Sequence, residues 1–163
     1  MSLPHFDGRL IYLASPYTHR YPAVVHQRYV AAVRAVGHLA RHGLRAYSPI
    51  GHTHPLTEYV GQQTLEYWLA YDMPLLLRSD ELWVLCLSGW TSSAGVAEEI
   101  RVAREHGKPI RYLLPAENVN DPVQFLESSS SLTEDWSASG DMPDTSASSR
   151  PSLCAGCVAS AVD

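Results

Sequence analysis

Short apolar runs and amphipathic stretches alternate along residues 9–127. The run Arg9–Ala14 (RLIYLA) predicts a buried strand, because Ser15 and Pro16 end it at once. Similar runs predict three further strands, over Leu44–Tyr47, Glu81–Leu87 and Pro109–Leu114. Apolar residues at helical spacing predict helices over 22–42, 57–77 and 93–106, with a last helical turn over 121–127. Pro74 is expected to start a new helix or to bend the second one.

This alternation predicts an α/β protein, a three-layer sandwich in which helices cover both faces of a short parallel sheet of four or five strands. In such folds ligands bind beyond the carboxyl ends of the strands. The segments expected to form a site are therefore the loops Ser15–Tyr21, Ser48–Leu56 and Ser88–Gly95.

The composition changes after residue 127. Residues 128–163 hold 11 serines, five acidic side chains and one arginine, and they show no repeating apolar pattern. All eight histidines lie before this segment. A serine-rich, acidic segment of this kind buries too little apolar surface to order itself. We predict one folded domain over 1–127 and a disordered tail over 128–163.

The net charge and several absent motifs argue against whole classes of protein. A net charge of −5 disfavours a groove for extended nucleic acid. No run approaches the about 18 apolar residues of a membrane helix, and the N-terminus lacks the pattern of a signal peptide, so a cytoplasmic protein is expected. The sequence has no GxGxxG, GxxxxGK[ST] or GxSxG, which argues against dinucleotide dehydrogenases, P-loop NTPases and α/β-hydrolases. Its single CxxC, in the tail, is half a zinc site and is taken as a chance occurrence.

The strongest site signal is the segment from Ser88 to Glu99 (SGWTSSAGVAEE), which leads into the last long helix. Serines at a helix start cap free backbone N–H groups, and this is the expected role of Ser92. The same N–H groups with a serine hydroxyl also form an anion site. Ser93, followed by Gly95, is therefore either a cap or a ligand of a phosphate group.

The two adjacent glutamates of this helix differ in their angular position. Val96, Ile100 and Ala103 mark its buried stripe, so Glu98 points to the opposite side and should pair with Arg101 or Arg104. Glu99 lies at the margin of the stripe, where a carboxylate is costly to bury. Periodicity leaves two readings open for Glu99, a structural ion pair and a functional group.

Other polar and aromatic residues near the predicted loops have ordinary structural explanations beside functional ones. Asp72 could cap a helix that begins near Pro74, and Tyr12 could be a core aromatic. The His52-x-His54 pair could bind zinc, but no further ligand stands at a suitable spacing, so hydrogen bonding to a ligand is preferred and no metal site is predicted.

Taken together, the motifs resemble a protein family. They are Tyr12-Leu-Ala-Ser15-Pro-Tyr17, Ser-Pro-Ile with His52 and His54, Trp68-x-x-x-Asp72, Gly89-Trp90, and Ser93-x-Gly95-x-x-x-Glu99. Over about residues 9–114 the chain is similar to a small bacterial and phage family within the nucleoside 2-deoxyribosyltransferase-like superfamily, which includes nucleoside 5′-monophosphate N-glycosidases. The Ser-x-Gly-x-x-x-Glu helix start is the most specific of these motifs.

The resemblance implies a flavodoxin-like fold, Rossmann-like in its layers, that cleaves or exchanges the bond between a base and C1′ of a (deoxy)nucleoside or its 5′-monophosphate. It implies that Glu99 is the nucleophile, that Asp72 assists at the base or sugar, and that Tyr12 orients the nucleophile. It also implies that Ser93 holds a 5′-phosphate. The remaining motif residues are expected to bind substrate: Ser15, Tyr17, His52, His54, Trp68, Gly89, Trp90 and Gly95.

The chemistry agrees with these residues. Breaking an N-glycosidic bond builds positive charge on the sugar, which a carboxylate below C1′ can stabilise or capture. Such a step needs no metal or redox cofactor, and the residues do not decide between a hydrolase and a transferase. The alternative is a non-catalytic module of the same fold that binds or senses nucleotides.

The aromatic residues of the middle helical region predict self-association. Tyr59, Trp68 and Tyr71 give more aromatic surface than one thin domain easily covers, so a homodimer or higher homo-oligomer is expected. Members of the superfamily also pair so that one subunit helps to complete the site of the other.

Overall fold

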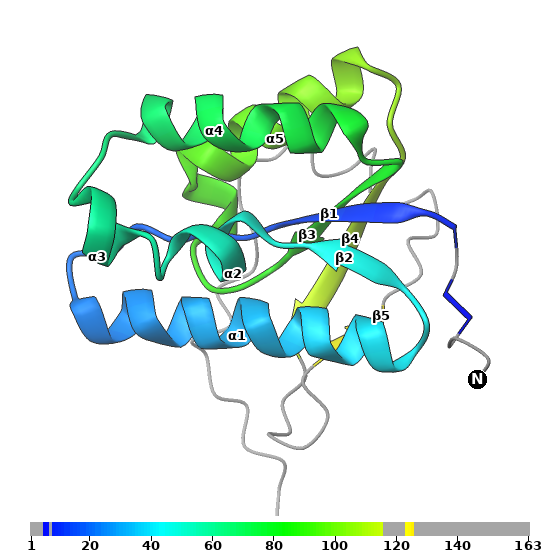
Figure 1. Ribbon diagram of the computed structural model, residues 1–163, viewed down its shortest axis with the longest axis horizontal. Helices are drawn as coiled ribbons and strands as arrows, with labels where there is room; N and C mark the ends of the chain where they lie inside the picture. The colour runs from blue at the N-terminus through cyan, green and yellow to red at the C-terminus, as the bar shows by residue number, and fades with distance from the viewer. Residues whose placement is uncertain (1–4, 7, 116–122, 126–163) are drawn as a thin grey trace, which may run out of the picture. The chain divides into compact units, whose positions relative to one another are not determined.

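The computed structural model describes residues 5–6, 8–115 and 123–125 (Figure 1). Its five strands are β1 (Leu10–Ala14), β2 (Arg45–Tyr47), β3 (Glu81–Leu85), β4 (Ile110–Pro115) and β5 (Val123–Phe125). They form one sheet in the order β2-β1-β3-β4-β5. The first four strands are parallel, and β5 pairs antiparallel with β4 at the edge. The helices are α1 (Pro22–Arg41), α2 (Pro49–Thr53), α3 (Thr57–Val60), α4 (Leu65–Arg78) and α5 (Ala94–Glu105), with a 3₁₀ turn, η1, at Trp90–Ser92.

The described helices form a layer on each face of the sheet. Figure 1 shows α1 below the strands and α4 with α5 above them. Helix α5 contacts β3 and β4, α4 contacts β1, and α1 contacts β2. The predicted three-layer α/β sandwich is therefore confirmed.

Side chains along β1 alternate between the two faces of the sheet, so successive residues face different helical layers. Ile11 and Leu13 are fully buried in one cluster with Ala35 and Leu39 of α1. Because successive strand residues point to opposite faces, Tyr12 between them must point to the other face, toward α5. A core position on this strand thus places a phenol beneath the helix that carries Glu99.

Several predicted elements differ from the structure. The helix predicted over 57–77 is two helices, because Gly61 ends α3 at φ 69° and the Thr64 hydroxyl accepts from the Tyr67 N–H at the start of α4. Pro74 lies inside α4, so of the two alternatives for this residue the start of a new helix is wrong. The predicted loop over 48–56 contains α2, which the Ser48 side chain caps.

The helical turn predicted over 121–127 is wrong. Residues 123–125 (Val-Gln-Phe) form β5 and pair with Leu113–Pro115 of β4. Two of these three residues have high strand propensity, and pairing with β4 gives their backbone partners that a single helical turn cannot supply. The predicted tail, 128–163, lies outside the described residues. Along the parts of the chain that are described, no helix is long and apolar enough to cross a membrane.

Candidate active site

A cleft of about 720 Å³ lies beyond the carboxyl ends of the parallel strands. The loops that follow β1 and β3 line it together with parts of α1, α2, α4 and α5. Eight of the twelve predicted site residues lie on its wall: Ser15, Tyr17, Trp68, Asp72, Gly89, Ser93, Gly95 and Glu99. The cleft therefore lies where a parallel α/β fold is expected to have one.

Glu99 is buried on α5, with 7% of its surface exposed, and it lines the cleft. The Tyr12 hydroxyl donates to its Oε1 at 2.7 Å. Burial raises the pKa of Glu99 to about 8; the hydrogen bond from Tyr12 opposes that rise and the nearby charge of Asp72 adds to it. The helical phase predicted for Glu99 is therefore confirmed, and the structural ion pair considered for it is absent among the described side chains.

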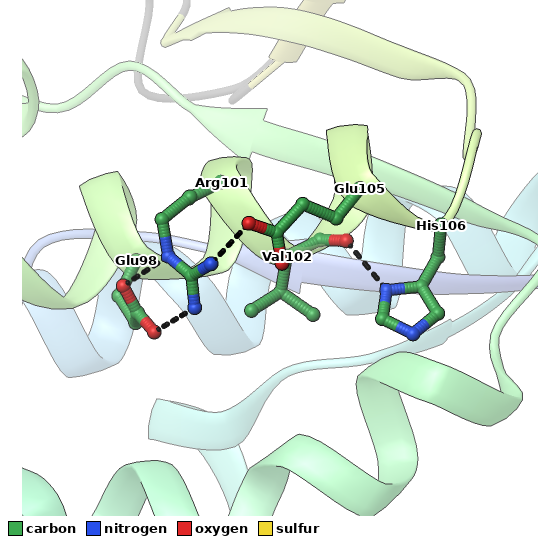
Figure 2. Close-up of polar contacts among 5 residues, drawn as sticks. All are labelled: Glu98, Arg101, Val102, Glu105 and His106. Carbon is green, nitrogen blue, oxygen red and sulfur yellow. Dashed lines mark hydrogen bonds and ion pairs between the residues drawn. The ribbon is translucent and has the colours of Figure 1, made fainter.

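The neighbouring Glu98 lies on the outer side of α5, as predicted. Figure 2 shows it beside Arg101, whose Nη2 lies 2.6 Å from Glu98 Oε1 and whose Nε donates to Oε2 at 2.8 Å. Arg101 also pairs with Glu105 one turn later. Glu98 and Glu99 are consecutive on α5, yet the first forms a solvent-facing ion pair and the second is a buried carboxyl.

Asp72 is the second buried carboxyl of the cleft, with 5% of its surface exposed. The Tyr47 hydroxyl donates to Asp72 Oδ1 at 2.8 Å. Burial raises the pKa of Asp72, against the hydrogen bond from Tyr47 and the charge of His52. Because Asp72 stands in the interior of α4, the structural alternative considered for it, a helix cap near Pro74, is wrong.

Glu81 is a buried carboxylate that forms ion pairs, and it contrasts with Glu99 and Asp72. It lies at the start of β3, pairs with Arg9 and Arg111, and accepts from Trp83 Nε1 at 2.8 Å. Burial alone raises the pKa of Glu81, but the hydrogen bonds from Trp83 and Arg9 and the two arginine charges outweigh it and hold the pKa below its usual value. Glu99 and Asp72 have phenols where Glu81 has cations, so they keep raised pKa values.

Two serines of the cleft differ in their partners. Ser15 is buried at the end of β1, and its hydroxyl has no hydrogen-bond partner within the described part of the chain. Ser93 is the N-cap of α5 and accepts from the Val96 N–H at 3.5 Å. The cap expected at Ser92 is wrong, because its hydroxyl donates to the Gly89 carbonyl at 3.1 Å instead. The long Ser93 contact and the orphaned Ser15 hydroxyl leave both groups able to bind a ligand.

The structure does not place His52, His54, Trp90 or Tyr12 on the wall of the cleft. Tyr12 acts from behind Glu99, and Trp90 is buried against Tyr112. His54 Nδ1 lies 2.7 Å from the Tyr17 hydroxyl, so it reaches the cleft only through that tyrosine. His52 is exposed and stacks on Tyr71. Direct contact of His52, His54 and Trp90 with a ligand remains a prediction, as does the role of Tyr12 in orienting Glu99.

Sequence reasoning missed two residues of the site. Arg28 lines the cleft from α1 and donates to the carbonyls of Thr18 and Ser88, each at 2.7 Å, so it ties the loops after β1 and β3 together. Tyr47 holds Asp72 from β2. A polar residue on a surface helix and an aromatic residue in a short strand carry no signal of these roles. Among the described residues, no group of three or more His, Cys, Asp or Glu side chains is placed to hold a metal ion.

The architecture of the sheet and its helices defines the fold. Four parallel strands between helical layers, with the cleft at their carboxyl ends, form the α/β fold of the 2-deoxyribosyltransferases. The solved structure of a 2-deoxyribosyltransferase from the psychrotolerant bacterium Bacillus psychrosaccharolyticus is similar, with a TM-score of 0.50 and 18% sequence identity. The similarity covers 76% of this chain and 89% of that one.

The chain belongs to the family described as Domain of unknown function (DUF1937), whose profile matches residues 9–113. This family is part of the nucleoside 2-deoxyribosyltransferase-like group, so the predicted resemblance is confirmed. No curated protein matches the chain.

Burial of Glu99 has a consequence for stability. A carboxyl whose pKa is raised on folding stabilises the fold fully below its unfolded pKa, and this contribution is lost as pH rises through the folded pKa, here about 8. Glu99→Gln stays neutral and can still accept from Tyr12. At pH 9 we therefore expect the unfolding free energy of this variant to exceed that of the wild type by roughly 2–5 kcal/mol. Its melting temperature should be correspondingly higher. The difference should shrink toward zero below about pH 4.5. Calorimetry of both proteins across this range checks it, and a difference that does not vary with pH would contradict it.

Proposed function

We propose that this protein cleaves or exchanges the N-glycosidic bond of a (deoxy)nucleoside or its 5′-monophosphate, with Glu99 as the nucleophile. The observation that carries the proposal is the pair Glu99 and Asp72. Both are nine-tenths buried, both line one cleft, and neither forms an ion pair with a described cationic side chain. Enzymes that cleave glycosidic bonds use two such carboxyl groups, which face a common cleft without neutralising partners. Membership of the nucleoside 2-deoxyribosyltransferase-like group supports the same chemistry.

In the proposed first step a Glu99 oxygen attacks C1′ and forms a glycosyl ester. The bond from C1′ to the base nitrogen breaks, and its electron pair leaves with the base. Asp72 gives its proton to the departing base and becomes a carboxylate. In the second step water or another base attacks C1′ and releases Glu99, while Asp72 recovers a proton from the attacking group.

The electrostatics of the pair supply one proton for these roles; the charge of Asp72 places it first on Glu99, so the proposed step requires its transfer to Asp72 before Glu99 attacks. The reaction needs one ionised and one protonated carboxyl. Burial raises both pKa values, and the charge of Asp72 raises that of Glu99 further. The pair therefore tends to retain one proton near neutral pH, a proton that belongs to both groups together.

The remaining wall of the cleft supplies groups for the rest of the substrate. Trp68 and Leu69 of α4 offer apolar surface to a base, while Ser15 and Ser93 offer hydroxyls. We propose that Ser93 and the free N–H groups at the start of α5 hold a 5′-phosphate, with Arg28 as a cation that lines the same cleft. This arrangement favours monophosphates over plain nucleosides.

The aromatic surface of the middle helices supports self-association. Tyr59 is 85% exposed and Tyr71 44% exposed, with Leu65 and Tyr67 each 43% exposed nearby in the sequence. Exposed apolar side chains, here on α3 and α4, are more stable when covered. We propose that a second copy of the chain covers them, in a homodimer or a higher homo-oligomer.

Base release tests the proposed function. The full chain is incubated with a panel of nucleosides, 2′-deoxynucleosides and their 5′-monophosphates, with and without a second free base, and the products are separated by chromatography. We expect release of a free base from at least one substrate and faster release from monophosphates. A new nucleoside formed only with the added base identifies a transferase. Binding of a ligand with no base release in any case would instead establish a nucleotide-binding module.

A further inference from the structure

Tyr47 of β2 donates a hydrogen bond to Asp72, just as Tyr12 of β1 donates one to Glu99. We infer that Tyr47 is a positioning residue: its hydroxyl fixes and stabilises the Asp72 carboxyl from which the departing base takes its proton. The inference rests on the proposed function, which gives Asp72 that role. It concerns a residue whose contact with Asp72 only the fold reveals.

The geometry comes from the register of the sheet. Tyr12 and Tyr47 are direct partners on the adjacent parallel strands β1 and β2. Register partners point to the same face, and the two rings lie 5.9 Å apart between centroids. Each hydroxyl donates to a different carboxyl, Tyr12 to Glu99 at 2.7 Å and Tyr47 to Asp72 at 2.8 Å. Two neighbouring strands thus hold the two carboxyl groups of one cleft.

The hydrogen bond assigns separate tasks to the two oxygens of Asp72. Oδ1 accepts the Tyr47 hydroxyl, so the transferable proton belongs on Oδ2. When this proton passes to the base nitrogen, Asp72 becomes a carboxylate that the Tyr47 hydroxyl already faces. A hydrogen bond to a charged acceptor is stronger than one to a neutral acceptor. Tyr47 therefore favours the departure of the proton, an effect on kcat and not on binding.

Other elements bring few competing groups to Asp72. His52 of α2 contributes a charge, and Glu99 of α5 and Tyr12 of β1 interact with Asp72 electrostatically. In the described part of the chain, the hydroxyl of Tyr47 is the side-chain donor that hydrogen-bonds to Asp72. Removing it leaves the Asp72 carboxyl without that donor while the Tyr47 ring stays in place.

The kinetic test compares Tyr47→Phe with the wild type on two leaving groups. One substrate carries an ordinary purine, which must be protonated as it leaves; the other carries an N7-methylated purine, which leaves as a neutral base without a proton. We expect kcat to fall about 10-fold on the ordinary substrate, with KM within about twofold, and to stay near the wild-type value on the methylated one. Tyr59→Phe, a change at a tyrosine of α3 that is 85% exposed and does not line the cleft, is the matched control and should leave both rates unchanged.

A second readout does not depend on turnover. The Asp72 carboxyl carbon is titrated by ¹³C NMR in the full-length wild type and in Tyr47→Phe, with Asp72→Asn to assign the signal. Because the hydrogen bond from Tyr47 lowers the pKa of Asp72, its loss should raise that pKa further. An unchanged or lower pKa would overturn the inference, as would an equal loss of kcat on both substrates or no loss on the ordinary one. If the wild type released no base at all, the proposed function would fail, and the titration would still show whether Tyr47 governs the state of Asp72.

Discussion

We expect Glu99→Gln to abolish base release while the protein still binds its substrate. We expect kcat to fall by about 10⁴-fold or more, the size of loss seen when a member of a covalent catalytic unit is removed. An amide oxygen can still accept from Tyr12, so the side chain keeps its place, but it cannot form the glycosyl ester. Single-turnover base release measures the loss, and equilibrium binding of the intact substrate measures what remains.

Glu98→Gln is the matched control because it makes the same chemical change one residue away. Its carboxylate pairs with Arg101 on the outer side of α5 and does not line the cleft. Exposed ion pairs of this kind contribute little to stability, so neither activity nor folding should change appreciably. Comparable losses of base release in both variants would show that α5 acts through its overall charge and not through a nucleophile at Glu99.

The positions of these two glutamates show how far a sequence pattern reaches. The apolar spacing of Val96 and Ala103 is enough to phase α5, and the phase separates Glu98 from Glu99. The same reasoning places the cleft, because alternating strands and helices fix which loops gather at the carboxyl ends. Periodicity is a local property, and local properties are what these predictions needed.

The features that the sequence does not reveal depend on contacts between distant segments. The hydrogen bond of Tyr47 to Asp72 exists because β1 and β2 pair in one particular register, which a three-residue strand does not reveal by itself. The Arg28 contacts with two loop carbonyls likewise require α1 to lie across both loops. The division of the second predicted helix is different, because it depends on a local signal: Gly61 ends α3 and Thr64 caps the start of α4.

Asp72→Asn gives the second large effect, and its size should depend on the leaving group. Asparagine can still accept from Tyr47 but has no proton of the required acidity to give to a base. We expect kcat on an ordinary nucleoside or monophosphate to fall by about 10²–10⁴-fold, the usual contribution of a general acid. On the N7-methylated purine substrate, which needs no proton, the loss should be less than about tenfold. Similar losses on both substrates would mean that Asp72 binds the sugar and is not the acid.

The pH dependence of the activity of Asp72→Asn distinguishes the titration of Glu99 from that of Asp72. In the wild type the pair loses its last proton as pH rises through about 8, so kcat/KM on the ordinary substrate should fall above that pH. Asp72→Asn removes both the proton donor and the charge that raises the pKa of Glu99. On the methylated substrate the variant should therefore need only ionised Glu99, with activity that rises through a pKa below about 8 and then stays level into alkaline pH. A fall in the activity of Asp72→Asn above pH 8 on this substrate would assign the shared proton to a group other than Asp72.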